Sequence, residues 1–206
     1  MGCNKENALR IWERFYQRSC RCREFFIEPD TIVWYDTYTF NTRRKNMNKQ
    51  QIYAHFNALG IPFEVTEHEA VYTMEDLAQV ALAHPEAEAK NLFVRDDKKQ
   101  HYYLITVPAH KRVDLKLFQK QQGLRKLSFG SSEDLLALLQ LTPGAVTPLG
   151  LLNDSAHRVE LYLDRSFEGQ LISIHPNENT ATVCLKTDDL VQILTKSGCA
   201  VHITEI

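Results

Sequence analysis

The sequence predicts a mixed α/β or α+β domain built around one β-sheet, and three observations support this class. The chain has 206 residues, of which 44% are apolar, which is enough for one good hydrophobic core. Helical and strand-like patterns alternate irregularly after residue 46, so a regular βαβ repeat is not expected. Short polar stretches such as residues 96–100 separate strand-like segments and predict hairpins.

The first regular element is predicted to begin just after Met47. Asn48 is a plausible N-cap, Ile52, Phe56 and Leu59 share one helical face, and Gly60 is a stop signal. Residues 1–46 show no persistent period of 3.6 or 2.0 residues. We therefore expect a domain at residues 47–206, preceded by an extension that is either disordered or upstream of the true start.

The remaining elements follow from periodicity and from capping signals. Thr73 and Asp76 have the spacing of a capping box, which predicts a helix over residues 73–83. Further helices are predicted at residues 114–122, 133–140 and 188–196, the last capped by Thr187. Strands are predicted at residues 61–67, 91–95, 101–107, 158–163, 171–174, 181–185 and 200–204.

Several function classes find no support. The chain has no glycine-rich phosphate loop, no G-x-S-x-G elbow and no H-E-x-x-H motif. The five cysteines form neither a disulfide framework nor a paired zinc motif, so reduced thiols, no metal and no cofactor are expected. Four histidines have no spacing that pairs them, and we expect them to be surface or satisfied side chains: His84, His101, His110 and His202.

Charge and hydropathy limit the kinds of partner that the chain can bind. No apolar run approaches the roughly 20 residues of a membrane-spanning helix, so a soluble, cytoplasmic protein without a membrane partner is expected. The net charge is −2, with nine Lys or Arg against six Asp or Glu in residues 1–46 and 15 against 20 afterwards. This balance disfavours a protein that grips long nucleic acid, although a local basic patch could hold a few phosphates.

Three irregular stretches are candidates for a site. Lys90 stands directly before an apolar strand, where an exposed lysine at the strand edge is the alternative. Residues 127–130 and 142–150 are rich in Gly and Pro and predict loops whose amides can approach an oxyanion, with an ordinary turn as the alternative. Residues 174–182 join two strands and place His175 and Asn179 at the sheet rim, or simply form a polar hairpin tip.

A family resemblance connects these stretches. The motifs are AKNLFV at residues 89–94, LSFG at 127–130, PGAVTP at 143–148, LND at 152–154 and HPNENTAT at 175–182. They occur in the order seen in the YbaK and prolyl-tRNA synthetase editing-domain family. Residues 47–206 resemble most its free-standing branch, which removes alanine from tRNA for proline. The resemblance implies a partly barrel-like mixed sheet flanked by helices.

The resemblance also assigns residue roles. Lys90 resembles the family's lysine at the aminoacyl ester, and Gly144 and Pro148 resemble its G-x-x-x-P loop, so Lys90 and Gly144 are the expected catalytic residues. His175 resembles the histidine that lines the amino-acid pocket. The expected substrate-binding residues are Asn91, Phe129, Gly130, Thr147, Pro148, His175, Asn179 and Thr180.

The implied activity is trans-editing deacylation of tRNA(Pro) carrying a mischarged small amino acid, with alanine as the first candidate. An aminoacyl ester is already activated, so positioning water and stabilising the oxyanion can suffice without a covalent nucleophile. The expected partner of the monomer is the acceptor end of mischarged tRNA, and the resemblance also allows prolyl-tRNA synthetase or an elongation factor. The alternative is a non-catalytic regulatory module that binds aminoacyl-tRNA or a synthetase.

Overall fold

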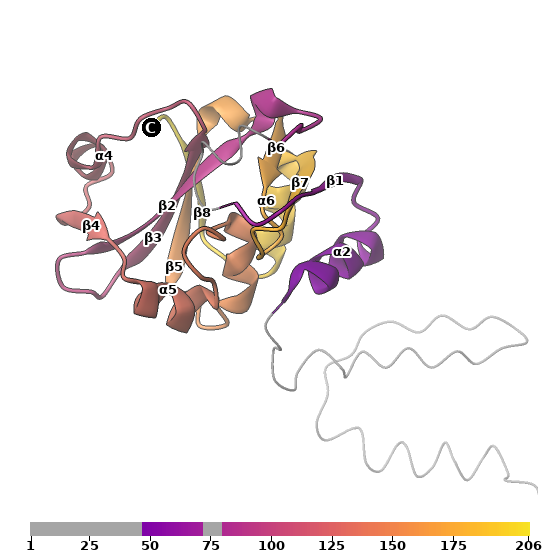
Figure 1. Cartoon of the computed structure of the whole chain (residues 1–206). Helices are drawn as coiled ribbons and strands as arrows, with labels where there is room; N and C mark the ends of the chain where they lie inside the picture. The colour runs from indigo at the N-terminus through magenta and orange to yellow at the C-terminus, as the bar shows by residue number, and fades with distance from the viewer. Residues whose placement is uncertain (1–46, 72–79) are drawn as a thin grey trace, which may run out of the picture. The chain divides into compact units, whose positions relative to one another are not determined.

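The computed structural model describes residues 47–71 and 80–206 (Figure 1). Its α-helices are α2 (Lys49–Ala58), α4 (Leu115–Gln121), α5 (Ser132–Leu139) and α6 (Thr187–Lys196). Its strands are β1 (Phe63–Glu67), β2 (Ala89–Asp96), β3 (Tyr102–Pro108), β4 (Leu127–Phe129), β5 (Val159–Asp164), β6 (Leu171–Ile174), β7 (Ala181–Lys186) and β8 (Val201–Thr204). Three short 3-10 helices connect them: η2 (Pro85–Ala87), η3 (Pro148–Asn153) and η4 (Arg165–Phe167).

The strands form two sheets. One has five strands in the order β4-β2-β3-β5-β8, and the other has three in the order β1-β7-β6. In the larger sheet, β2 and β3 form an antiparallel hairpin, while β3, β5 and β8 run parallel to one another. Both pairings of the smaller sheet are antiparallel. The mixed α/β class is thus confirmed.

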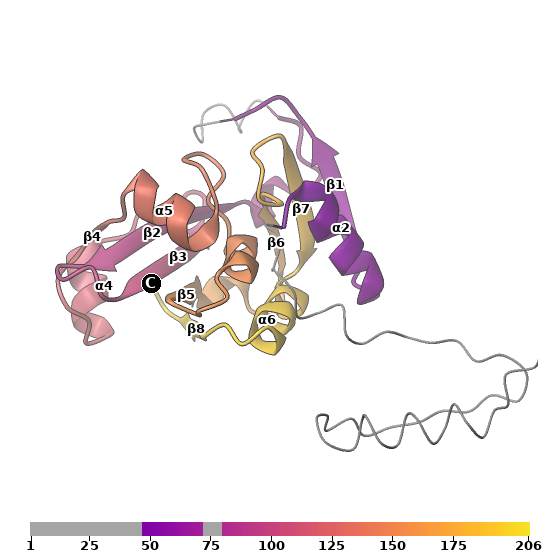
Figure 2. The same cartoon turned by 90° about the horizontal axis from the view of Figure 1, so that it is seen from below.

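Side chains on the two faces of the larger sheet build two separate cores. Every residue of β3 is buried, and its side chains alternate between the faces. Tyr102 and Leu104 join the main core with helices α5 and α6, whereas Tyr103 and Ile105 join a smaller core under Phe118 of α4. In both views β2 and β3 run between α4 and α5 (Figures 1 and 2).

Helix α2 is fixed both by its cap and by its buried face. Asn48 and Gln51 form a complete capping box, as the sequence predicts. Ile52 and Phe56 are fully buried, and the Phe56 ring packs edge-on against Phe63 of β1. Leu59, which the helical period places with them, is the C-cap residue and is 49% exposed, because the helix has ended before it.

The main chain at Met47 is held from two directions. Its N–H donates to Oδ1 of Asn153 at 2.9 Å, and its carbonyl accepts from Nδ2 of Asn177 at 2.6 Å. Asn153 ends η3, and Asn177 lies in the turn between β6 and β7. The start of α2 therefore ties η3 to the β6–β7 turn.

Four details differ from expectation. The strands form two sheets instead of one, and the described strands close no barrel. Residues 80–83 are not helical, and Thr73, the expected cap, lies outside the described residues. Thr187 is the first residue of α6 and makes no cap, because Lys186 occupies the N-cap position and the Thr187 hydroxyl is buried. No helix in residues 47–71 and 80–206 is long and apolar enough to cross a membrane.

We predict that a chain beginning at Met47 unfolds with the same free energy as the full chain, because Met47 keeps its hydrogen bonds to Asn153 and Asn177 and the described core is retained. A matched chain beginning at Ile61 loses α2 and two fully buried side chains, Ile52 and Phe56. It should lose more than about 4 kcal/mol, because each large buried side chain is worth about 2–5 kcal/mol. Urea unfolding followed by circular dichroism measures both. Equal stability of the two shortened chains would contradict this account.

Candidate active site

The loop between α5 and η3 is shaped by residues with special backbone angles. The C-cap of helix α5 is Gln140, whose φ is +55°. Gly144 has a φ of +88°, a backbone conformation that residues other than glycine rarely adopt. The Ala145 N–H donates to the Thr142 carbonyl at 3.0 Å and closes a turn. Pro148 then begins η3, with Thr147 as its N-cap. The predicted G-x-x-x-P loop is thus a turn followed by a helix start.

One side chain fixes this loop to the larger sheet. Nδ2 of Asn91 donates to the Val146 carbonyl at 3.0 Å, and Oδ1 of Asn91 accepts from the fully buried Thr106 hydroxyl at 2.7 Å. Asn91 and Thr106 face each other in the β2–β3 register. The structure therefore brings together four predicted site residues, Asn91 and the loop's Gly144, Thr147 and Pro148.

Two main-chain N–H groups of the loop are not used in hydrogen bonds within the described residues. The N–H groups of Val146 and Thr147 donate to no acceptor in the described part of the chain. By contrast, the Thr147 hydroxyl accepts from the Leu149 N–H at 3.4 Å and helps to cap η3, and Thr147 and Pro148 are both buried. The loop can thus offer main-chain donors to an anion, while the Thr147 side chain serves the local fold.

Lys90 lies next to Asn91 in β2, but its ammonium reaches a different segment. It donates to the carbonyls of Ala109, at 3.4 Å, and Lys111, in the turn that follows β3. Lys111 in turn pairs with the buried Asp164 at 2.6 Å. Because successive side chains of a strand point to opposite faces, Lys90 and Asn91 serve different neighbours.

Glu88 lies two residues before Lys90 and is half-buried. Burial raises the pKa of Glu88, and its Oε1 atom has no hydrogen-bond partner in the described part of the chain. The Glu88 carbonyl accepts from the Ala109 N–H at 2.9 Å, so the same turn meets both Glu88 and Lys90. Sequence reasoning overlooked Glu88 because an acidic residue between two alanines looks like an ordinary exposed one.

The β6–β7 turn holds the other predicted residues. Nδ1 of His175 lies 2.9 Å from the Ala181 carbonyl, which makes it the donor and leaves Nε2 as the acceptor of a neutral ring. Burial lowers the pKa of His175, and the hydrogen bond to Ala181 opposes this in part. Asn179 donates to the Val71 carbonyl at 2.8 Å, and the Thr180 hydroxyl accepts from Lys49 at 3.2 Å. Asn179 and Thr180 thus hold neighbouring segments of the chain.

His68 is a neighbour that sequence reasoning missed. Its ring centroid lies 5.9 Å from that of His175, and its Nε2 lies 3.0 Å from the Thr182 hydroxyl. The two histidines are 107 positions apart in the sequence, and only the pairing of β1 with β7 brings their segments together. Of the histidines expected to be satisfied or exposed, His202 pairs with Glu160 and His84 lies beside Glu64 and Glu86.

The predicted residues Phe129 and Gly130 lie at the end of β4. Phe129 is 63% exposed and pairs with Val94 of β2. Gly130 packs against the Phe93 ring so closely that a Cβ atom there would come within 2.3 Å of it. The need for glycine at position 130 is therefore steric. In the described residues, no hydrogen bond, ion pair or ring contact joins this pair to the loop or to His175.

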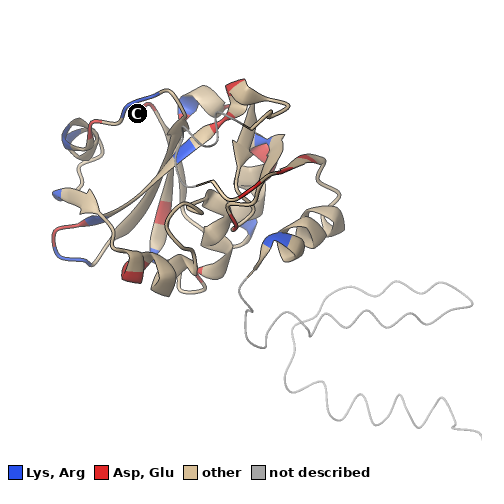
Figure 3. Ribbon diagram, viewed as in Figure 1, with Lys and Arg blue, Asp and Glu red and all other residues tan. Residues whose placement is uncertain are grey.

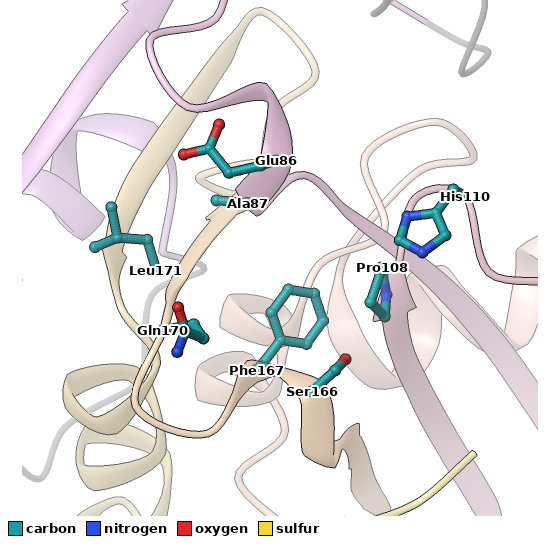
Figure 4. A pocket seen from close by; sticks show the side chains of 8 residues that line it. All are labelled: Glu86, Ala87, Pro108, His110, Ser166, Phe167, Gln170 and Leu171. Atoms are coloured by element: carbon teal, nitrogen blue, oxygen red, sulfur yellow. The ribbon is translucent and has the colours of Figure 1, made fainter.

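A hollow of about 370 Å³ lies beside the turn that holds Lys90 (Figure 4). His110, from that turn, lines one side, Glu86 and Leu171 lie across from it, and the buried Phe167 lies between them with Ser166 next to it. The remaining lining comes from Ala87, Pro108 and Gln170. None of the predicted site residues lines it. Elsewhere in residues 47–71 and 80–206, no group of three or more His, Cys, Asp or Glu is placed to hold a metal ion.

The architecture and the order of the motifs along it are those of an aminoacyl-tRNA editing domain. The family model of the aminoacyl-tRNA editing domain matches residues 68–193, and the chain belongs to that family. Prolyl-tRNA editing protein ProX of Acetoanaerobium sticklandii is 38% identical over 151 residues, which cover 73% of this chain and 92% of that protein. Prolyl-tRNA synthetase associated domain-containing protein 1 of Bos taurus is 34% identical over 146 residues, which cover 68% of this chain and 85% of that protein.

Solved structures share the fold at lower identity. One described as "a putative trans-editing enzyme for prolyl tRNA synthetase" superposes with a TM-score of 0.57 at 21% identity, covering 77% of this chain and 96% of that one. The crystal structure of the hypothetical protein APE2540 superposes with a TM-score of 0.55 at 16% identity, covering 74% of this chain and 97% of that one. These likenesses show the fold of the chain.

The burial of His175 gives a pH test. Because its pKa in the folded protein is lowered below 6.5, the ring contributes stability that is fully present above pH 6.5 and is lost as pH falls through the folded pKa. We predict that His175→Gln flattens the fall in unfolding free energy below pH 6.5. The difference approaches at most about 1.4 kcal/mol per pH unit, the limit for one proton.

Denaturant unfolding at several pH values from 7.5 to about 5 measures the slope. His110→Gln, at an exposed histidine that forms no ion pair in the described part of the chain, is the matched control and should leave the slope as in the unmodified chain. Parallel curves for His175→Gln and the unmodified protein would contradict the assignment of a buried, neutral imidazole.

Proposed function

We propose that the chain is a trans-editing aminoacyl-tRNA deacylase that hydrolyses the ester of a mischarged small amino acid, alanine first, on tRNA for proline. Membership of the editing-domain family and the name of the ProX relative, a prolyl-tRNA editing protein, support an editing role. The observation that carries the proposal is the Asn91 contact with Val146, which fixes a glycine loop with two unused N–H donors beside the strand that holds Lys90.

The chemistry fits such donors. Attack of water on an aminoacyl ester develops negative charge on the carbonyl oxygen, and main-chain N–H groups that are already in place stabilise it without reorganisation. The free hydroxyl of the terminal ribose can assist the water, so the chain needs no covalent nucleophile. The Val146 and Thr147 amides are the candidate donors, and His175 is the candidate wall of the amino-acid pocket.

Lys90 is the candidate cation for the ester or the terminal phosphate. At present it donates to two neutral carbonyls, those of Ala109 and Lys111. A phosphate or an oxyanion accepts a stronger, charge-assisted hydrogen bond than a neutral carbonyl does. The flexible lysine stem can therefore exchange the turn for substrate when the acceptor end binds.

Selectivity for small amino acids follows from size. A tight pocket excludes the proline ring by steric clash and so protects correctly charged tRNA. One methyl group is worth only about 1–3 kcal/mol, so a pocket that accepts alanine discriminates weakly against smaller residues. We infer that hydrolysis falls in the order alanine, then larger side chains, then proline.

Residues 47–206 are the proposed catalytic domain. The family match lies within this range, at residues 68–193, and the anchoring of Met47 by Asn153 and Asn177 supports a start there. Mischarged tRNA is the proposed partner. The names of the Bos taurus relative and the solved neighbour refer to prolyl-tRNA synthetase, which supports that enzyme as a second partner.

One observation favours a second function, a regulatory module that binds aminoacyl-tRNA or a synthetase without hydrolysis. Several side chains expected at the substrate already have protein partners, since Lys90 holds a turn and Asn179 and Thr180 hold neighbouring segments. A site whose polar groups serve the fold can still bind a ligand through shape. Hydrolysis at the background rate with measurable tRNA binding would establish this second function.

The test compares single-turnover hydrolysis of tRNA(Pro) charged with alanine, serine, cysteine or proline. We predict that Lys90→Ala lowers the rate on the alanyl substrate by at least about 10²-fold, the typical cost of one charge or donor at an oxyanion. Lys90→Arg keeps the charge but replaces a compact ammonium with a planar fork, so it should restore little of the rate.

The control is Lys186→Ala, at an exposed lysine that ends β7, which should react as the unmodified chain does. Thermal melting of each variant separates loss of structure from loss of rate, since Lys90 is a half-buried residue of β2. A Lys90→Ala rate within about threefold of the unmodified chain would return Lys90 to a structural role.

A further inference from the structure

Positive charge is concentrated in one part of the described domain. Residues 97–126 contain eight Lys or Arg and two Asp or Glu, whereas residues 47–96 and 127–206 together contain seven against 18. The blue segments at α4, at the β2–β3 hairpin and at the start of β4 lie at the same end of the domain (Figure 3). The chain is therefore acidic overall but has one strongly basic end.

Six exposed cations form what we term the basic surface. They come from the β2–β3 hairpin tip, the outer face of α4 and the segment between α4 and β4: Lys98, Lys99, Lys116, Lys120, Arg125 and Lys126. Lys116 and Lys120 are one helical turn apart, so both point away from the buried Phe118 side of α4.

Hydrogen bonds join the three segments. Arg125 binds both carboxylate oxygens of Asp97, at 2.8 and 3.0 Å, which attaches the segment before β4 to the hairpin tip. Gln119 of α4 accepts from the N–H groups of Leu124 and Leu127, through its main chain and its side chain. The six cations therefore belong to one continuous surface.

Most of this charge is not neutralised. The two acidic residues of the region have other tasks, since Asp97 is paired with Arg125 and Asp114 caps α4. Of the six cations, only Arg125 takes part in an ion pair in the described part of the chain. Five lysines in an acidic protein are thus available to a polyanion.

The spacing from the candidate active site suits a nucleic-acid duplex. Strand β2 runs from Ala89, beside Lys90, to Asp96 at the hairpin. At about 3.3 Å per residue, the six steps from Lys90 to Asp96 span roughly 20 Å. This length corresponds to about six base steps of roughly 3.4 Å. A tRNA whose 3′ end reaches Lys90 can therefore lay the phosphates about six nucleotides away along the basic surface.

We propose that the basic surface binds the phosphate backbone of the tRNA acceptor stem. This inference rests on the proposed deacylase function, which places the 3′ end of the tRNA at Lys90. Lysines that neutralise phosphates release counterions, so binding becomes weaker as salt rises. The surface reads charge and duplex geometry, and it leaves base identity to contacts nearer the 3′ end.

The test is the affinity for uncharged tRNA(Pro), measured by fluorescence anisotropy between 50 and 200 mM salt. Lys116→Ala combined with Lys120→Ala should reduce the slope of log K against log salt by about 2, one unit per lost phosphate contact. The affinity at 0.1 M salt should fall by about tenfold or more. Neither lysine is buried, so the double variant should melt as the unmodified chain does.

The matched control removes two exposed lysines at the other part of the domain, Lys186→Ala with Lys196→Ala. It changes net charge equally and should leave the slope unaltered. Equal slopes for the two double variants would overturn the proposal. The same proteins are assayed for hydrolysis of alanyl-tRNA(Pro). If the unmodified chain hydrolyses this substrate but the two double variants have equal salt slopes, the basic-surface proposal alone is refuted. If the salt slopes differ but the unmodified chain does not hydrolyse the substrate, the deacylase proposal alone is refuted.

Discussion

The hydrogen-bond pair made by the Asn91 side chain is the contact on which the candidate site depends. Its amide donates to the Val146 carbonyl and accepts from the buried Thr106 hydroxyl, so it joins the glycine loop to both strands of the central hairpin. Leaving a buried polar partner unpaired costs about 1–3 kcal/mol, so the loop has one strongly favoured position. Asparagine suits this position because its side chain both donates and accepts.

A second set of contacts ties the smaller sheet to the start of the domain. The β6–β7 turn binds Met47 through Asn177, Val71 through Asn179 and Lys49 through Thr180. Polar side chains that resemble substrate contacts thus hold the scaffold, and His175 is left half-enclosed among them with a neutral ring. The turn orders the neighbouring segments of the chain, which explains its polar composition without assigning every residue to substrate.

Local chemistry made much of the fold predictable. The cap at Asn48 and the positive φ of Gly60 and Gly144 depend on neighbouring residues, which sequence patterns report directly. Long-range pairing does not leave such a signal. The pairing of β1 with β7 creates the second sheet and brings His68 to His175, and neither follows from any local period. The hydrogen bond of the Lys90 ammonium to the turn after β3 likewise depends on tertiary structure and leaves no local sequence signal.

The central claim is that a loop held by Asn91 supplies the donors for ester hydrolysis, and Asn91→Asp tests it most directly. The carboxylate still accepts from Thr106 but repels the Val146 carbonyl, so the loop is released. The measurement is single-turnover hydrolysis of alanyl-tRNA(Pro), with Thr106→Ser, which keeps the hydroxyl, as control. The account predicts a rate at least about tenfold lower for Asn91→Asp and within about threefold of the unmodified chain for Thr106→Ser. Hydrolysis by Asn91→Asp at the unmodified rate would contradict it.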